Sequence, residues 1–171
     1  MKIQQYVSKV EKTKEFKEFM KKDSKAYLCS LFFVRDFSEN HNETHIDFYS
    51  PKTKKITSFN LDKKVTKVPL DKKAENIKHE KFVPKKIGSK IKLDLEKVKP
   101  IIVDEMHNRG LTDNIQKMIV ILQNTEGRDI WNCTCFLNGL GLLQCKVEDS
   151  SETVLFMEKQ SFFDLIKIFR K

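Results

Sequence analysis

The chain has 171 residues and a mass of 20.2 kDa, which is the size of one compact domain or two small modules. Its 39% hydrophobic residues exclude global disorder, and its five glycines and four prolines exclude a fibrous or low-complexity protein. No segment approaches the roughly 20 apolar residues of a membrane span, and the N-terminus lacks the apolar core of a secretory signal. We therefore expect a cytoplasmic protein that has no membrane partner.

The net charge of +9 comes from the middle of the chain. Residues 51–100 contain 16 lysines and six acidic residues, which gives +10, whereas residues 1–50 sum to +1 and residues 101–171 to −2. Such a concentration of lysine can bind a polyanion, or it can keep a linker extended by its own repulsion.

All four prolines lie within residues 51–100, and periodicity is weak between residues 62 and 92. We therefore interpret 62–92 as a Lys-rich connector between a first module, 1–61, and a second module, 93–171. The candidate polyanion contacts are Lys63, Lys64, Lys67, Lys72, Lys73, Lys85, Lys86 and Lys90.

The first module has the pattern of one helix followed by three strands. Apolar residues at three- and four-residue steps predict a helix over residues 3–22. Residues 26–35 are rich in aromatic and β-branched side chains, which is typical of a strand. Residues 44–50 and 55–61 predict two more strands, joined by a turn at 51–54 in which proline presets φ.

The second module repeats a helix followed by strands. Asp94 is a candidate N-cap for a helix that ends at Gly110, and Pro100 is expected to shift the start of that helix toward Lys99. The strands that follow are predicted at 116–123, 129–137, 142–148 and 153–158.

A last helix is predicted from Ser161 onward. Its apolar side consists of Phe162, Leu165, Ile166 and Phe169. We expect this helix to dock on the core, although an amphipathic helix with basic residues at its end also resembles an interfacial membrane anchor.

The cysteines are predicted to be buried. Alternation places Trp131, Cys133 and Cys135 on one side of strand 129–137, with Cys145 on the matching side of the next strand. A disulfide framework is typical of secreted chains, and the C-x-x-C spacing of zinc sites is missing. We therefore interpret the thiols as small apolar side chains, with a metal held among them as the alternative.

Two of the predicted strands are apolar on both faces. Residues 26–34 and 116–123 show this pattern, so we expect both strands to lie in the centre of a sheet that is covered on both sides. The extra cover would come from the other module or from the last helix.

The second half resembles the PepSY module, a small unit of one helix and an antiparallel sheet, over about residues 93–159. The matching residues are Trp131, Val147, Asp149 and Val154. Ser151 and Glu152 stand where the PepSY hairpin has Thr-Gly, a glycine that allows a positive φ. PepSY modules are known mainly as extracytoplasmic binding or peptidase-inhibitory modules, so the resemblance implies a binding role.

The first half has a similar strand–turn–strand segment and is interpreted as a diverged second copy. The predicted fold is therefore α+β, with two similar helix-plus-antiparallel-sheet modules of PepSY or cystatin type and a C-terminal helix. The whole chain is also similar to short archaeal proteins from small genomes, on the segments KEFKEF (14–19), AYL (26–28) and IWN (130–132). That second resemblance implies no activity.

The sequence contains no recognisable catalytic constellation. It has no G-x-S-x-G, P-loop or G-x-G-x-x-G motif. His41, Glu43 and His45 would share one side of an extended segment and would then suit a transition metal, but their polar surroundings favour a solvated loop. We expect no catalytic residue, no metal site and no cofactor.

The leading hypothesis is a non-enzymatic protein- or peptide-interaction module. The alternative is a basic RNA- or ribosome-associated factor. The chain has 29 lysines but only 4 arginines, and arginine is the usual residue for bidentate phosphate and base contacts. The composition therefore favours the protein-binding hypothesis.

Overall fold

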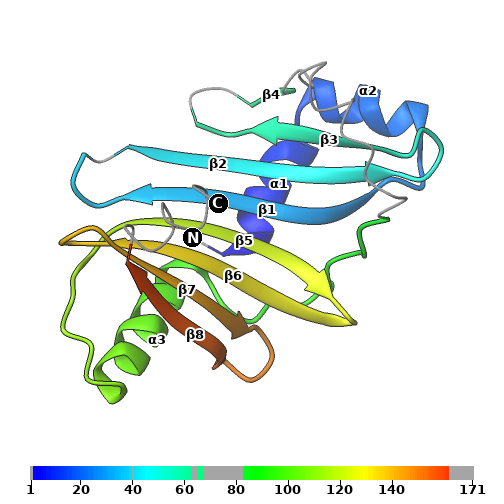
Figure 1. The fold of residues 1–171 in the computed structure, drawn as a ribbon. Helices are drawn as coiled ribbons and strands as arrows, with labels where there is room; N and C mark the ends of the chain where they lie inside the picture. The colour runs from blue at the N-terminus through cyan, green and yellow to red at the C-terminus, as the bar shows by residue number, and fades with distance from the viewer. Residues whose placement is uncertain (1, 40, 63–64, 68–82, 162–171) are drawn as a thin grey trace, which may run out of the picture.

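The computed structural model describes residues 2–39, 41–62, 65–67 and 83–161. These residues form a mixed α+β fold with three helices and one eight-stranded antiparallel sheet (Figure 1). The helices are α1 (Ile3–Glu11), α2 (Lys14–Lys22) and α3 (Leu95–Asn108). Within the described ranges, no helix has the length and apolar character needed to cross a membrane.

The sheet joins the two halves of the chain. Its strands are β1 (Tyr27–Asp36), β2 (Asn42–Ser50), β3 (Lys55–Asn60), β4 (Thr66–Lys67), β5 (Ile115–Thr125), β6 (Arg128–Leu137), β7 (Gly141–Glu148) and β8 (Thr153–Ser161). Their order is β4-β3-β2-β1-β5-β6-β7-β8, so the first strands of the two halves pair with each other. The prediction that the two apolar strands are central is confirmed.

The first half contributes two helices and then four consecutive strands, where three strands were predicted, and the second half contributes one helix and then four strands. The additional strand, β4, lies in the expected connector and pairs with β3 at Phe59 and Asn60. Strand β4 could not be predicted from the sequence, because a two-residue strand is too short to show an alternating pattern.

The single helix predicted over residues 3–22 is wrong, because Thr13 divides it. The Thr13 hydroxyl accepts a hydrogen bond from the Phe16 N–H at 3.2 Å and donates one to the Val10 carbonyl at 2.7 Å. Thr13 thus caps the start of α2 at the point where α1 ends. The apolar stripe continues across the break, which is why periodicity alone predicted one helix.

The predicted shift of the third helix toward Lys99 is also wrong. Helix α3 begins at Leu95 with Asp94 as its N-cap residue, and Pro100 lies inside the helix. Leu95 and Val98 are buried together with Ile102 and Met106. Burial of this first turn outweighs the backbone hydrogen bond that Pro100 cannot donate. Gly110, with φ of 71°, follows the helix as predicted.

The predicted last helix falls on residues 162–171, which are outside the described residues. Ser161 itself is the final residue of β8 and pairs with Gly141 of β7.

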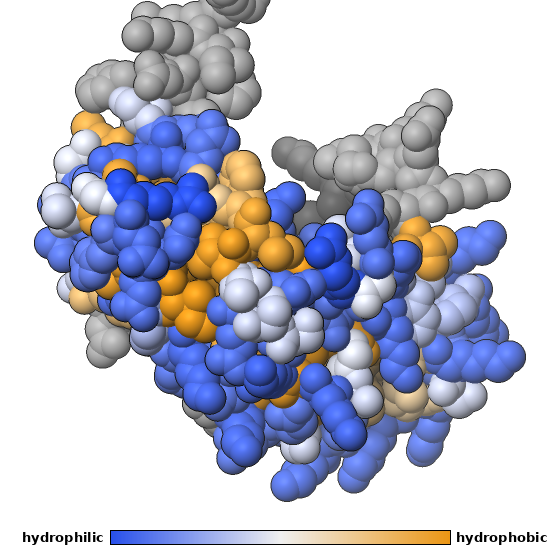
Figure 2. All heavy atoms as spheres, turned by 90° about the horizontal axis from the view of Figure 1, so that it is seen from below, coloured by the Kyte–Doolittle hydropathy of each residue, from blue (hydrophilic) through white to orange (hydrophobic). Residues whose placement is uncertain are grey.

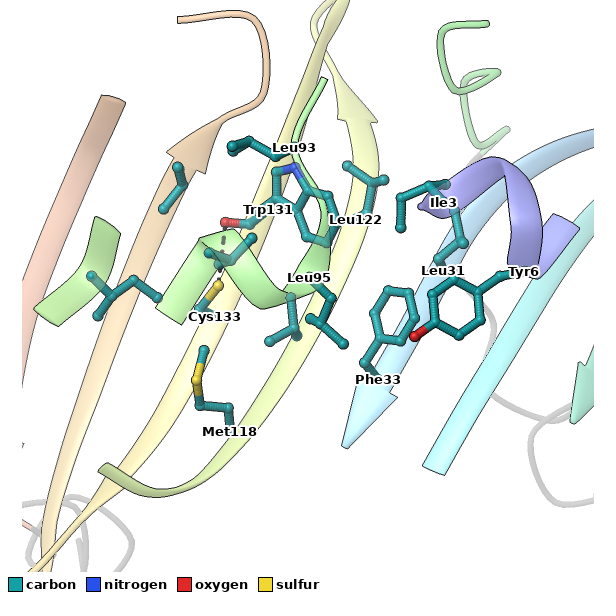
Figure 3. Close-up of a cluster of buried hydrophobic side chains, with 14 of the residues drawn as sticks. Ile3, Tyr6, Leu31, Phe33, Leu93, Leu95, Met118, Leu122, Trp131 and Cys133 are labelled. Atoms are coloured by element: carbon teal, nitrogen blue, oxygen red, sulfur yellow. Dashed lines mark hydrogen bonds between the residues drawn. The ribbon is translucent and has the colours of Figure 1, made fainter. Parts of the chain in front are cut away.

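All three helices lie on one face of the sheet (Figure 1) and enclose one core. Phe16 of α2 packs against Phe48 of β2 with ring centroids 4.8 Å apart. Phe33 of β1 and Trp131 of β6 stack with centroids 6.3 Å apart, so the core runs without a break from one half to the other. Figure 3 shows this cluster between α1, α3 and the central strands.

Candidate interaction surface on the second face of the sheet

The predicted lysine set is only partly placed by the structure. Lys63, Lys64, Lys72 and Lys73 lie outside the described residues, and Lys67 belongs to β4. Lys85, Lys86 and Lys90 are exposed on the segment 83–94 that leads to α3. Their contact with a polyanion stays a prediction.

Hydrogen bonds at several points hold segment 83–94 against the sheet. Pro84 O accepts from the Tyr27 hydroxyl at 2.7 Å, and the Gly88 N–H donates to the Asp129 carboxylate at 3.0 Å. Farther along, the Lys92 N–H donates to Asp149 Oδ2 at 2.7 Å. The exposed lysines therefore project from an anchored segment.

A cleft of about 510 Å³ lies beside Lys90, Lys92 and Arg128, and its charge is largely balanced. Asp129 and Asp149 line the same cleft. Lys92 Nζ lies 2.9 Å from Glu152 Oε1, and an Arg128 guanidinium nitrogen lies 3.5 Å from Glu148 Oε1. These ion pairs reduce the positive potential that an anion would encounter.

The four thiols are buried and do not line a reactive site. Cys133 Sγ lies 3.7 Å from the Trp131 carbonyl inside the core (Figure 3). Burial raises the pKa of the Cys29 thiol to about 12. Hydrogen bonding to the Cys145 thiol, together with burial, raises the pKa of Cys135. The predicted placement of the thiols on the core side is confirmed, and protonated buried thiols are poor nucleophiles.

The structure does bring His41, Glu43 and His45 together. The two carboxylate oxygens of Glu43 lie 2.8 Å from His41 Nε2 and 3.8 Å from His45 Nε2. Both histidines therefore contact the Glu43 carboxylate through hydrogen bonds or ion pairs. The His41 side chain is largely exposed. Among the described residues, no group of three His, Cys, Asp or Glu side chains has the geometry to hold a metal ion.

The second face of the sheet is the one opposite the helices, and cross-strand pairing defines its residues. One row runs from β2 through β1, β5, β6 and β7 to β8, and the adjacent row crosses the same strands. The first row is His45, Phe32, Ile121, Asn132, Lys146 and Phe156. The adjacent row is Glu43, Val34, Ile119, Thr134, Gln144 and Glu158.

The two central strands of this second face carry apolar side chains, and the flanking residues of the same two rows are polar except for Phe156. Phe32, Val34, Ile119 and Ile121 occupy the two central strands. No helix of the described part covers them (Figure 1). An apolar sheet face is normally packed against a second layer, so this patch is a candidate interface.

Two polar atoms on the second face have no hydrogen-bond partner although they are buried. They are Asn132 Nδ2 and Gln160 Oε1. Buried amide groups are nearly always paired in folded proteins, so an unpaired donor and an unpaired acceptor on one face indicate a missing partner for that face. Sequence reasoning missed this feature because it depends on which strands are neighbours.

Large apolar side chains are exposed at several places on the molecule, including the second face. Seen from the side of α3 and β8, an apolar area lies among hydrophilic residues (Figure 2). The large apolar side chains that are exposed in the described ranges are Phe37, Val83, Phe136, Leu140, Leu155 and Phe156. Phe156 belongs to the second face, and Phe136 pairs with Lys117 and Leu142 in a third row on that face.

A second concavity lies on the helix side of the sheet. It has a volume of about 480 Å³ and lies between α1 and residues 86–91, with Leu28 and Phe48 among the sheet residues that line it. Ile3 and Val7 of α1 contribute apolar walls. Its size is that of a small-molecule site.

Comparisons with known proteins bear on the fold alone. No protein-family model matches the chain, and no curated protein matches it. The chain is similar to the crystal structure of a protein from Clostridium difficile 630 that is described as a putative lipoprotein, with a TM-score of 0.54 and 13% identity. The match covers 85% of this chain and 90% of that one. It supports the mixed α+β architecture over nearly the whole chain.

Proposed function

We propose that this protein is a non-enzymatic interaction module that binds a protein or peptide partner on the second face of its sheet. The observation that carries the proposal is the apolar patch of Phe32, Val34, Ile119 and Ile121 in the centre of a face that no described helix covers. A cytoplasmic location and the PepSY resemblance of residues 93–159 belong to the same proposal.

The patch has the dimensions of one helix. It spans two strands and their immediate flanks, which is about 10 Å at a strand spacing of about 4.8 Å. An α-helix with its side chains has a diameter of about 10–12 Å. The partner we propose is an amphipathic helical segment whose apolar side packs on the patch.

The β8 edge of the sheet is a less suitable docking site than its face. Strand β8 is irregular where Lys146 and Val147 pair with it, and an Arg109 guanidinium nitrogen donates to the Met157 carbonyl at 3.0 Å. Bulges and occupied backbone groups discourage the addition of another strand.

The test compares the wild-type chain with Ile121→Glu, which places a charge in the patch. Leu140→Glu is the matched control, because Leu140 is 61% exposed and lies in the loop between β6 and β7. Proteins that co-purify with the wild type are identified, purified and titrated against all three chains by calorimetry. We expect Ile121→Glu to lose the affinity and Leu140→Glu to retain it. Equal affinity for all three chains would refute the proposal.

The alternative is the basic RNA- or ribosome-associated factor, and one observation favours it. Lys85, Lys86 and Lys90 are exposed on a single anchored segment. If Lys85→Gln, Lys86→Gln and Lys90→Gln together abolish retention on RNA at low salt, and Ile121→Glu leaves that retention unchanged, the alternative replaces the proposal.

A further inference from the structure

The end of helix α2 and the turn between β2 and β3 meet at one corner of the molecule (Figure 1). Asp23, which follows α2, joins them. Its carboxylate accepts hydrogen bonds from the Ser50 hydroxyl at 2.6 Å and from the Lys52 N–H at 3.0 Å. Lys52 Nζ donates to the Lys22 carbonyl at the end of α2, at 3.3 Å. These contacts hold the turn against the end of the helix.

Six exposed lysines are gathered at this corner, which we call the basic corner. They come from residues 21–25 and 52–55, and they are Lys21, Lys22, Lys25, Lys52, Lys54 and Lys55. Asp23 is the single acidic residue in these two segments, and it is buried. The two segments together therefore carry a net charge of +5, and the resulting positive potential extends into the solvent.

The charge of the basic corner is not balanced by ion pairs. Elsewhere on the surface, lysines are paired with acidic side chains, as Lys92 is with Glu152 at 2.9 Å and Lys159 with Asp113 at 2.7 Å. Among the residues that the structure describes, no acidic side chain forms an ion pair with Lys21, Lys25 or Lys54. These charges are therefore available to an anionic partner.

A structural role accounts for only part of this cluster. Lys21 and Lys22 lie in the last turn of α2, where positive charge interacts favourably with the helix dipole. The same reason does not apply to Lys54, which lies in the turn between β2 and β3. Its φ is 55°, a left-handed conformation that favours glycine or asparagine, so the backbone does not explain a lysine there.

The surroundings of the basic corner favour a phosphate backbone as its partner. The aromatic side chains of Phe19, Phe48 and Tyr49 are buried, so the corner offers no platform on which unpaired bases could stack. Its two segments contain none of the large apolar side chains that are exposed in the described chain, so nothing there would insert into a membrane. Lysine binds phosphate as a point charge and does not read bases as arginine does.

We propose that the basic corner binds the phosphate backbone of a nucleic-acid duplex without reading its sequence. Duplexes of DNA and RNA share this chemistry, because both carry a dense array of phosphates on the outside. The apolar patch of the proposed function lies on β1 and β5, whereas the basic corner lies at the ends of α2, β2 and β3. The two sites are therefore separate, and duplex binding does not depend on the proposed function.

The test measures binding of the full chain to fluorescein-labelled DNA and RNA duplexes of one sequence by anisotropy, over a series of salt concentrations. The corner variant combines Lys21→Gln, Lys25→Gln and Lys54→Gln, which removes three charges and leaves the contacts of Lys22 and Lys52 intact. The control variant combines Lys85→Gln, Lys86→Gln and Lys90→Gln, which removes the same charge from segment 83–94.

We expect the wild type and the control variant to bind both duplexes alike, and the corner variant to lose at least about tenfold in affinity at low salt. The plot of log affinity against log salt should also become shallower in the corner variant by up to about 2.7, at about 0.9 for each lost phosphate contact. Replacing the same three lysines with arginine keeps the charge and should keep the affinity.

Circular dichroism checks that each variant is folded. If the corner variant does not fold, Lys25→Glu provides the comparison, with Lys85→Glu as its control, because Lys25 lies outside the helix and the strands. The single charge reversal should lower the affinity for both duplexes, and its control should not.

Several results would overturn the inference. One is a wild type that binds neither duplex at low salt, and another is an equal loss of affinity in the corner and control variants. A larger loss in the control variant would assign the phosphates to segment 83–94. Tighter binding to the unpaired strand than to the duplex would contradict the absence of base stacking. If vesicles of phosphatidylcholine and phosphatidylglycerol retain the wild type but not the corner variant, and the duplexes do not bind, the corner is a membrane contact.

This inference and the proposed function can fail separately. Ile121→Glu should leave the affinity for both duplexes unchanged, and the corner variant should keep its affinity for the protein partner. A loss of duplex binding in Ile121→Glu as large as that in the corner variant would show that the two sites are not separate.

Discussion

The indole Nε1 of Trp131 donates a hydrogen bond to Oδ1 of Asp149 at 3.0 Å, and both side chains are buried. The same carboxylate accepts the backbone N–H of Leu93 at 3.0 Å and that of Lys92 at 2.7 Å. Asp149 follows the last residue of β7, Trp131 belongs to β6, and Leu93 leads into α3. One carboxylate thus joins the sheet, the connecting segment and the third helix.

Asp149→Asn should lower the free energy of unfolding by about 2–4 kcal/mol. The amide nitrogen would face N–H donors, and a buried donor that loses its acceptor costs about 1–3 kcal/mol, or more where a charged group is lost. Urea denaturation measures the effect. The control is Asp113→Asn, because Asp113 forms a surface ion pair with Lys159 at 2.7 Å and such pairs contribute about 0–1 kcal/mol. Equal losses in both variants would contradict the structural role assigned to Asp149.

Local sequence patterns predicted most of the elements of this fold, because each strand carries its own alternation. The apolar runs of β1 and β5 also predicted their central place, since a strand that is apolar on both faces needs neighbours and cover. Two predicted helix boundaries were wrong. The helix over 3–22 is divided because the Thr13 hydroxyl caps α2, and α3 begins before Pro100 because its first turn is buried.

The candidate surface could not be predicted in the same way. The alternation in β1 and β5 places Phe32 and Ile121 on one face of each strand, but only the pairing of β1 with β5 makes them neighbours. That pairing joins residues about 90 positions apart and leaves no local sequence signal. The glycine position of the PepSY pattern is occupied by Glu152, whose φ is 57°, so the backbone there is left-handed without a glycine.

The thiols should be unreactive in the native state. Cys29, Cys133, Cys135 and Cys145 are all buried, and burial raises the pKa of Cys29 to about 12. At about pH 8 we expect almost no reaction with DTNB in buffer, because the thiolate is the reacting form and ordinary thiols have a pKa of about 8.5. In guanidinium chloride all 4 cysteines of the chain should react. A thiol that reacts rapidly in the native protein would show that the thiols are accessible after all.

Asp36 should contribute a stabilisation that is lost in acid. Its carboxylate accepts the Glu39 N–H at 2.9 Å and the Ser38 hydroxyl at 2.7 Å, and these hydrogen bonds lower its pKa from 3.8 to about 2. Because the pKa in the folded state lies below that of the unfolded chain, the stabilisation is complete above about pH 4 and disappears as the pH falls through about 2.

The free energy of unfolding of Asp36→Asn should therefore lie below that of the wild type at neutral pH, and the two should converge toward pH 2. Denaturation at a series of pH values measures this difference. Asp104→Asn, on the exposed side of α3, is the control and should follow the wild type throughout. A gap between wild type and Asp36→Asn that does not depend on pH would show that the carboxylate charge is not the cause.

Leu140→Gly should stabilise the protein. Leu140 has φ of 62° and is 61% exposed in the loop between β6 and β7, next to Gly139 with φ of 72°. A left-handed conformation costs a residue with a β-carbon about 1–2 kcal/mol, and the added freedom of glycine in the unfolded chain offsets part of that gain. We expect a net rise of up to about 1 kcal/mol in the free energy of unfolding. Leu140→Ala removes the same apolar surface but keeps the β-carbon, so it should give no rise. A gain in Leu140→Ala as large as that in Leu140→Gly would mean that side-chain exposure, and not backbone strain, destabilises the loop.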